Sequence, residues 1–521
     1  MTMQNLSRRD FFQSAAATGA ALVGASAFGA YAPSKAIAAP VTDTELEDIE
    51  WESSADLVVL GSGCAGMYAA YKAAEAGLDV ILLEKQPEET AGGDTRCMAA
   101  NMPRQKITYE NLVGTWSFGD IDEEWAAKIV EEIPNAVNWL LDHGCEWGGG
   151  MEDGMFEGNG AATYAALRDS LQETSVVVRY KTPAKSLIQN ANGEVIGVIA
   201  ESNGKSINVK AKRAVLVATG SYAANKQLLW DFHYPGIEMY SVGGPYLTGD
   251  GMIMAANIGA KLGKMSTGLE FDTVVSKAAS EECGTGIRMN LPPNPSVIYV
   301  NQDGVRFQNE YLPMQHSKST LPYVNFQGDP QDYNQGIAYY KNNVMWEVFD
   351  QAAFESGSVG NTGLFMTWAI QVPHDGYEWS ADNSAELEKG WIIQADTIEE
   401  LAEKMGVDAA ALTKTVADYN DGCAAGEDAF ERNPEQLIAL GEGPYYAVEL
   451  GIGILYNIGG LMTDANGRTL NWFNEPIPRL YSAGTVGMVG SYMGSLAARG
   501  NMAQGLIAVN DIQALDPWTE E

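Results

Sequence analysis

Cysteine and histidine are scarce in this sequence, which has five and four of them among 521 residues. The cysteines stand far apart and form no C-x-x-C pair, so neither a disulfide framework nor a metal or iron–sulfur site within the chain is predicted. No C-x-x-C-H motif for haem attachment occurs either. Any redox cofactor of this protein must therefore be one that is held without cysteine clusters.

Basic residues and long apolar runs are also few. Lysine and arginine number 32 against 68 aspartates and glutamates, which gives a formal net charge of −36. A surface of that sign repels nucleic acid and anionic lipid, so no nucleic-acid partner is predicted. No apolar run reaches the ~18 residues of a membrane-spanning helix. We therefore expect a protein that is soluble or peripherally associated with a membrane.

The first residues have the pattern of an export signal. Arg8 and Arg9 precede two phenylalanines and a short run of Ala, Gly and Leu, and Ala-Ile-Ala at 36–38 fits a cleavage site. We interpret 1–38 as a twin-arginine signal peptide and 39–54 as a linker. The alternative is a frayed helix or a membrane anchor, but the run is short and rich in Ala and Gly. Twin-arginine export machinery carries folded proteins, so the predicted location is the periplasm or the cell-wall side.

From residue 55 the pattern becomes that of a βαβ unit. Two apolar runs, 57–60 and 78–83, flank residues 67–76, which have helical spacing. A further run at 214–220 is expected to join the same sheet, and 176–210 alternates apolar and polar residues as a β-meander does. Parallel strands joined by a helix are typical of nucleotide-binding α/β domains.

A glycine-rich turn lies at the strand–helix junction. In Gly61-Ser-Gly63-Cys-Ala-Gly66 the first glycine permits the turn, the second lets a pyrophosphate approach the backbone, and the third lets helix and strand pack closely. Glu84 ends the second strand, where a carboxylate can accept hydrogen bonds from a ribose. This arrangement predicts a bound dinucleotide.

Residues 265–445 differ in texture from the rest. Their loops are rich in Pro, Asn and Gly, their helices are amphipathic, and their short apolar runs do not repeat the βαβ pattern. We interpret this segment as an inserted domain. The final 70 residues return to strands and glycine turns before an apolar helix at 502–514.

Several motifs resemble, in order, those of one superfamily: the flavoprotein subunits of fumarate reductase and succinate dehydrogenase, with the related 3-ketosteroid dehydrogenases. The resemblance extends from about residue 56 to 515. The motifs are GGDTRCMAAN (92–101), ATGSYAAN (218–225), LTGDGMIMAANIGA (247–260), VNQDGVRFQNE (300–310), GPYYAVEL (443–450) and GGLMTDANGRTL…IPRLYSAG (459–484).

The resemblance implies FAD as cofactor and an α/β fold. It implies a Rossmann-like FAD-binding domain, 55–264 and 446–521, split by an inserted α+β capping domain, 265–445. The residues predicted to bind FAD are Gly61, Gly63, Cys64, Ala65, Gly66, Glu84, Lys85, Gly92, Gly93, Asp94, Thr95, Ala218, Thr219, Gly220, Asp250 and Gly484.

The expected substrate site departs from that of fumarate reductases. In those enzymes an arginine a few residues after the Asn-Glu pair donates the proton, but Met314 stands at that position here. The histidine that precedes the paired glycines is replaced around Tyr456-Asn457-Ile458. Since a dicarboxylate needs fixed cations to offset the desolvation of its carboxylates, fumarate is not the predicted substrate.

Four residues are predicted to be catalytic. Tyr492 matches a tyrosine that assists proton transfer in the ketosteroid enzymes, and His316 lies beside the expected donor position. Tyr456 and Arg499 lie near the expected substrate. The alternatives remain open, because Tyr and Met are more often plain packing residues and His316 and its neighbour Lys318 could be ordinary surface residues.

Three functions are compatible with these features. The first is an exported FAD oxidoreductase that reduces an activated C=C bond of a small unsaturated molecule by hydride transfer from flavin N5 and protonation by a side chain. Its electrons would come from a separate donor, such as a membrane-linked cytochrome or a quinol-oxidising protein. The second is a dehydrogenase of the 3-ketosteroid type that introduces a C=C bond. The third is a flavoprotein that only binds a ligand or stores electrons.

Overall fold

The structure is a computed structural model. It describes residues 49–97, 107–117, 119–148, 155–232, 239–265, 269–311, 344–360, 377–457, 459–488 and 496–518. All of them lie in one compact unit, Ala38–Glu521. The predicted signal peptide lies outside the described residues.

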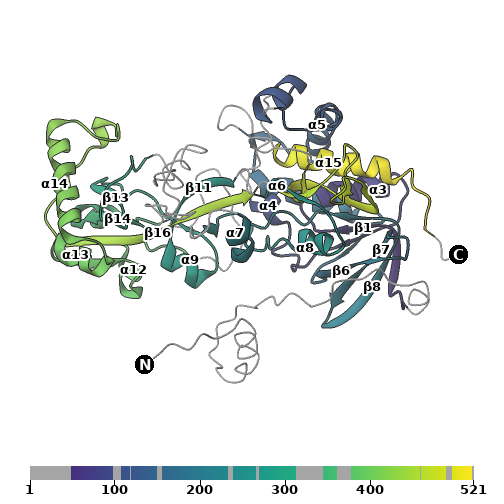
Figure 1. Cartoon of the computed structure of the whole chain (residues 1–521), viewed down its shortest axis with the longest axis horizontal. Coiled ribbons are helices and arrows are strands. Elements are labelled where there is room, and N and C mark those ends of the chain that lie inside the picture. Colours follow the sequence, from purple (N-terminus) through teal and green to yellow (C-terminus); the bar gives the residue numbers. More distant parts are fainter. Residues whose placement is uncertain are drawn as a thin grey trace, which may run out of the picture. The chain divides into compact units, whose positions relative to one another are not determined.

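Among the described residues, the first sheet has eight strands and a parallel centre. Figure 1 labels β1, β6, β7 and β8 of this sheet. Its order is β18-β19-β8-β1-β2-β5, and β6 and β7 extend it from β8. The central strands are short apolar runs that become fully buried, as parallel strands covered on both faces are. The eight strands are β1 (Ser53–Leu60), β2 (Val80–Leu83), β5 (Val177–Arg179), β6 (Ala184–Gln189), β7 (Val195–Ser202), β8 (Lys205–Val217), β18 (Arg468–Leu470) and β19 (Pro476–Ser482).

The predicted βαβ unit and β-meander are confirmed. β1, α3 (Cys64–Glu75) and β2 follow one another, with β1 and β2 parallel. β6, β7 and β8 pair antiparallel. β1 begins at Ser53, inside the segment expected to be a linker, because its first residues pair with β8.

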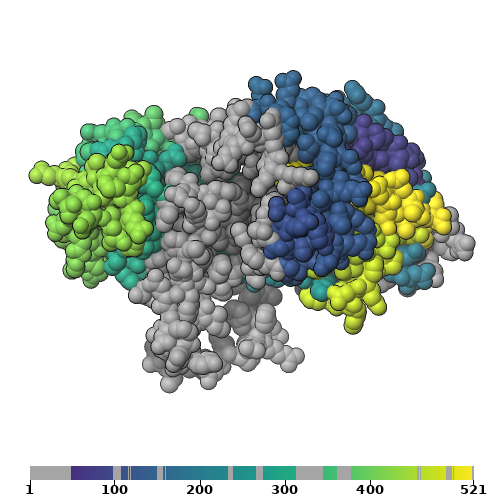
Figure 2. Space-filling view, turned by 90° about the horizontal axis from the view of Figure 1, so that it is seen from above, coloured from purple at the N-terminus to yellow at the C-terminus, as the bar shows by residue number. Residues whose placement is uncertain are grey.

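Three long helices pack together beside this sheet. α15 (Ala497–Ile512) contacts both α3 and α5 (Glu123–Asp142). Figure 2 shows the blue surface of α5 next to the yellow surface of the C-terminal helix. The predicted C-terminal helix is thus present and starts five residues earlier than expected. Other helices and strands of this region are α4 (Gly93–Cys97), η1 (Asn111–Trp116), β3 (Trp147–Gly148), β4 (Met155–Phe156) and α6 (Asn159–Gln172).

A second sheet has seven strands and is mostly antiparallel. Its order is β12-β11-β16-β14-β13, with β15 and β9 paired to β16. β9 lies entirely outside the predicted capping segment, 265–445, and β16 extends beyond the end of that segment. β16 continues its pairing with β11 to Asn457, and β9 pairs with the same part of β16. The strands are β9 (Met239–Ser241), β11 (Leu269–Ser276), β12 (Ile287–Arg288), β13 (Val297–Asn301), β14 (Met345–Asp350), β15 (Ile393–Ala395) and β16 (Tyr445–Asn457).

The amphipathic helices expected in this region form. Thr397 and Asp408 cap α13 (Ile398–Met405) and α14 (Ala409–Ala425), and each side chain accepts a hydrogen bond from a first-turn amide. Their apolar faces pack with Ile298, Val300 and other residues of the sheet into a core of their own. The other helices here are α9 (Lys277–Cys283), α11 (Gln351–Ser356), α12 (Ser384–Lys389) and η3 (Pro434–Gln436).

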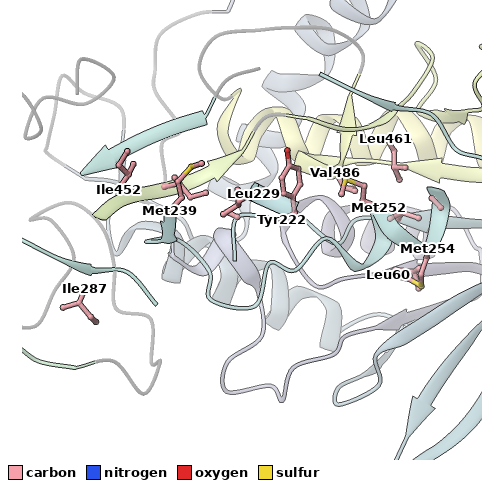
Figure 3. Close-up of a cluster of buried hydrophobic side chains, with 14 of the residues drawn as sticks. Leu60, Tyr222, Leu229, Met239, Met252, Met254, Ile287, Ile452, Leu461 and Val486 are labelled. Carbon is pink, nitrogen blue, oxygen red and sulfur yellow. The ribbon is translucent and has the colours of Figure 1, made fainter. Parts of the chain in front are cut away.

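A third, small sheet joins segments distant in sequence. β10 (Leu262–Gly263) and β20 (Gly487–Met488) both pair with β17 (Gly460–Met462). One large apolar core includes residues of all three sheets, and Figure 3 shows Leu60, Ile452, Leu461 and Val486 among them. The remaining elements are α7 (Lys226–Phe232), α8 (Asp250–Asn257) and η4 (Gly484–Val486).

A buried network of charges holds the second sheet to the loop after α14. Arg306 donates to both oxygens of Glu310, at 2.7 and 2.8 Å, and also pairs with Asp428. Arg432 lies 3.2 Å from Glu310 and donates to the carbonyls of Val297 and Pro295. Glu310 is thus a fully buried carboxylate between two arginines.

We predict that Glu310→Ala lowers the free energy of unfolding by about 3–5 kcal/mol, because it leaves two buried guanidinium groups without their shared partner. Urea denaturation measures the change. The control is Lys414→Ala, which removes one member of the exposed pair with Asp418 and should change stability by less than about 1 kcal/mol. A Glu310→Ala protein as stable as the control would contradict the prediction.

Glu347 is a second buried acid in the same sheet. It lies on β14 between Tyr299 and Val448 of the flanking strands, and all three residues are fully buried. Neither carboxyl oxygen has a hydrogen-bond partner among the described residues. Burial, followed by the nearby charge of Glu310, raises the pKa of Glu347 well above its ordinary value. The folded protein therefore holds Glu347 neutral.

We predict that Glu347→Gln removes a pH-dependent destabilisation. Unfolded Glu347 ionises above its ordinary pKa of about 4.3, whereas the folded protein keeps the proton. Stability is therefore fully present below that pH and is lost toward the raised pKa, by about 1.4 kcal/mol per pH unit. The variant should become progressively more stable than the wild type between pH 5 and pH 7, as urea midpoints would record. Glu442→Gln, at an exposed position, is the control; a constant difference between variant and wild type would refute the prediction.

Candidate FAD site

The turn between β1 and α3 requires glycine at two positions. Gly61 has φ +102°, and a Cβ there would lie 2.5 Å from the carbonyl oxygen of Ala218. A Cβ at Gly66 would lie 2.1 Å from the carbonyl oxygen of Gly61. The backbones of β1, β8 and α3 therefore meet at a distance that no side chain permits. In the first turn of α3 the amide of Cys64 donates to Thr95, whereas those of Ala65 and Gly66 have no partner within the helix and can meet a ligand.

Glu84 is fixed against this turn. Its Oε2 accepts hydrogen bonds from the backbone N–H of Ser62 at 3.0 Å and from the Ser62 hydroxyl at 2.6 Å. Its Oε1 accepts from the N–H of Gln86 at 2.7 Å. The carboxylate is buried and held in one orientation, as a ribose-binding acid must be.

Three other segments meet the turn. Thr95 accepts a hydrogen bond from the N–H of Cys64 at 2.8 Å, which attaches the 92–95 motif to α3. Ala218 donates its N–H to the carbonyl of Leu60 at 2.8 Å. A Cβ at Gly484 would lie 3.0 Å from the Cβ of Ala65. The structure thus brings the predicted residues of 61–66, 84, 92–95, 218–220 and 484 to one place.

Lys85 and Asp250 pair with each other beside that place. The Lys85 Nζ lies 2.8 Å from Asp250 and 2.6 Å from the hydroxyl of Thr248. Asp94, from the 92–95 motif, accepts a hydrogen bond from the N–H of Gly244 at 2.9 Å. These three predicted residues therefore also serve to fix the loop before α8.

Sequence reasoning missed one residue of the site. Gln504, on α15, is buried and accepts a hydrogen bond from the N–H of Gly484 at 2.8 Å. It gave no signal because a glutamine in an apolar helix belongs to no motif. Its contact holds the turn after β19 against α15.

Among the four predicted catalytic residues, only Arg499 has a described side chain. It lies in the first turn of α15 and is 4% exposed, and burial lowers its pKa to about 10. Its neighbour Ala498 has its carbonyl oxygen 3.8 Å from the Cys64 sulfur, so this turn lies at the start of α3. Arg499 is therefore a buried cation at the cofactor end of the domain.

The other catalytic predictions cannot be placed. Tyr456 belongs to β16, but its side chain lies outside what the structure describes. His316 and Tyr492, together with Met314 and Lys318, are outside the described residues. The residue after Tyr456 is informative, because the buried Asn457 accepts a hydrogen bond from the N–H of Tyr222 at 3.0 Å. The end of β16 is thereby fixed to the loop that follows the 218–220 motif.

Comparison of the sequence with known proteins identifies the family of this chain. The model of the FAD binding domain family matches residues 56–501. The chain belongs to this family. It is similar to a vinyl phenol reductase of Lactiplantibacillus plantarum, at 28% identity over 85% of this chain and 92% of the relative. It also matches a urocanate reductase of Eggerthella lenta, at 28% identity over 82% and 69% of the two chains.

A solved structure shares the fold. The open conformation of a flavocytochrome c3 fumarate reductase has a TM-score of 0.63 and 22% identity, over 92% of this chain and 82% of that one. The chain is a member of an FAD-dependent oxidoreductase family, and the relatives that it matches include reductases named for vinyl phenol and urocanate. The predicted fold class and cofactor are both confirmed.

The described residues fit FAD. The glycine turn leaves the amides of Ala65 and Gly66 without a partner inside α3, and Glu84 offers acceptor oxygens. The hydroxyl of Thr219, inside the predicted 218–220 motif, is buried and has no partner among the described residues. A buried hydroxyl of that kind is one that a bound molecule can satisfy.

We predict that Gly66→Ala yields protein with at least about tenfold less FAD per chain, because the new methyl group meets the Gly61 backbone rather than a movable side chain. The ratio of flavin to protein absorbance after purification measures this. Gly114→Ala is the matched control, since a Cβ there meets nothing within 4 Å. Normal flavin content in the Gly66 variant would contradict the predicted role of the glycine turn in FAD binding.

Proposed function

We propose that this protein reduces an activated C=C bond of an aromatic, enone or enoate acceptor, and that fumarate is not its substrate. The observation that carries the proposal is the candidate FAD site, formed around the glycine turn 61–66 and Glu84. The sequence of the same chain lacks the histidine and arginine expected to bind a dicarboxylate substrate. Similarity to reductases named for vinyl phenol and urocanate supports the same reading.

Different residues of the chain bind the cofactor, orient the acceptor and deliver the proton in this proposal. FAD, when bound, supplies a hydride from N5. The amides at the start of α3 and the Glu84 carboxylate hold the cofactor by its phosphates and ribose. The buried Arg499 stays cationic at neutral pH despite its lowered pKa, so it can orient an electron-rich group of the acceptor. We assign proton delivery to Tyr492 or His316, with Tyr456 as a lining residue.

Export and a separate electron donor belong to the same proposal. The twin-arginine pattern of 1–38 supports export of a folded, FAD-loaded chain, and outside the cytoplasm free NAD(P)H is absent. We propose a membrane-linked cytochrome or quinol-oxidising protein as donor. Within the part of the chain that the structure describes, no helix is long and apolar enough to cross a membrane.

Anaerobic assays with reduced methyl viologen test the proposal. We expect turnover with hydroxylated styrenes, aryl-acrylates or enones and a rate with fumarate at least about 100-fold lower, which corresponds to a loss of roughly 2.7 kcal/mol of transition-state stabilisation. Tyr492→Phe and His316→Ala should each be assayed. The variant that lacks the proton-donating side chain should lose about 10²–10⁴-fold in kcat. Fumarate as the best substrate, or inertness toward the whole panel, would overturn the proposal.

The second candidate is the reverse reaction, introduction of a C=C bond. It is favoured by the similarity to a 3-oxosteroid 1-dehydrogenase of Mycobacterium tuberculosis, at 30% identity over 63% of this chain and 58% of the relative. Oxidation of saturated 3-ketosteroids with an artificial electron acceptor, in place of viologen-linked reduction, would establish it.

A further inference from the structure

The turn between β18 and β19 places two aromatic side chains in solvent. Phe473 is 81% exposed and Trp472 is 63% exposed, the two highest values among the exposed large hydrophobic residues of the described chain. They are adjacent in sequence and flanked by Asn471 and Asn474, so the tip of the turn carries no charge of its own.

Hydrogen bonds within the turn hold the backbone around the two aromatic residues in a defined conformation. Asn471 donates its N–H to the carbonyl of Glu475 at 2.8 Å, and Asn474 donates to the carbonyl of Asn471 at 3.0 Å. The Asn471 side-chain oxygen accepts from the N–H groups of Phe473 and Glu475, at 2.8 and 3.1 Å. Docking this tip would cost little ordering entropy.

One side-chain contact anchors the tip to another segment of the protein, and a second hydrogen bond lies within the turn itself. Lys261, just before β10, donates from Nζ to the side-chain oxygen of Asn474 at 2.7 Å. The Asn471 amide donates to the carboxylate of Glu475 at 3.2 Å. Lys261 and Glu475 are thus charged groups that contact the two asparagines flanking the rings, and exposed charged groups remain hydrated.

The size of this apolar surface favours a lipid bilayer over a protein as the binding partner. Two aromatic side chains offer at most ~400–500 Å², whereas a stable protein–protein contact buries ~800 Å² on each partner. A bilayer needs no complementary surface: Trp and Phe partition into its headgroup region from a polar scaffold. Since the chain's net charge is −36, the lipid cannot be recognised through anionic headgroups.

We propose that the turn of Trp472 and Phe473 inserts into the headgroup region of a lipid bilayer and holds the protein reversibly on the membrane surface. The charged Lys261 and Glu475 limit insertion to the two rings. Binding is strongest to zwitterionic lipid and is weakened by anionic lipid at low salt, because the acidic chain is repelled.

Co-sedimentation of the full-length, FAD-loaded chain with phosphatidylcholine vesicles tests this. We expect Trp472→Ser/Phe473→Ser to bind at least about tenfold more weakly than the wild type, since it loses the inserted surface. The matched control is Trp230→Ser, which removes a half-exposed tryptophan of α7 and should bind like the wild type. Any effect of 1–38 is the same in all three proteins, and equal flavin content and melting temperature verify their folding.

A second arm adds phosphatidylglycerol to the vesicles. Wild-type binding should fall at low salt and recover at high salt. Three results would overturn the proposal: no binding of wild type to phosphatidylcholine, equal binding of wild type and double variant, or equal losses in the double variant and Trp230→Ser. If instead sedimentation velocity shows self-association that only the double variant abolishes, the turn is an interface between copies of the chain.

Discussion

The fold depends on one close approach of backbones, at the carboxyl end of β1. The carbonyl of Gly61 faces the first turn of α3 at Gly66, and the carbonyl of Ala218 faces Gly61, with no room for a methyl group at either point. This contact fixes where α3 begins, and α3 in turn positions α15. Glu84 and the turn at Gly484 are both placed relative to it.

Sequence patterns predict this centre well because its constraints are local. A strand, a glycine turn and a helix within 30 residues can be recognised without knowing any distant neighbour, and the resemblance supplied the motifs at 92–95 and 218–220. The position of Gln504 could not be predicted, because its role arises from contact between α15 and a turn 20 residues earlier. The extent of the second sheet was equally inaccessible, since β16 pairs with strands from both halves of the chain.

The second sheet shows how buried charge is used away from the cofactor. Glu310 is balanced by two arginines, and Asp428 shares one of them. Glu347 has no such partner among the described residues and remains neutral instead, at a cost in stability that grows with pH. A hydrophobic residue at position 347 would avoid this loss of folding free energy. The sheet therefore contains two kinds of buried acid. Glu310 is neutralised by arginines and joins the segments on both sides of α14, whereas Glu347 is neutral because burial keeps it protonated.

The two proposals meet in β19. This strand begins beside the exposed aromatic turn and ends at Ser482, directly before the turn at Gly484, which we predict to contact FAD. Its seven residues separate the two by roughly 20 Å along the strand. A protein held on a bilayer by Trp472 and Phe473 would keep its predicted FAD site within a few tens of ångströms of the membrane surface, on the side where the proposed membrane-linked donor would lie. Because β19 is paired with β8 and joins the aromatic turn to Gly484 without an intervening loop, attachment through this turn would raise the encounter rate with such a donor and leave the groups around the predicted FAD site unchanged.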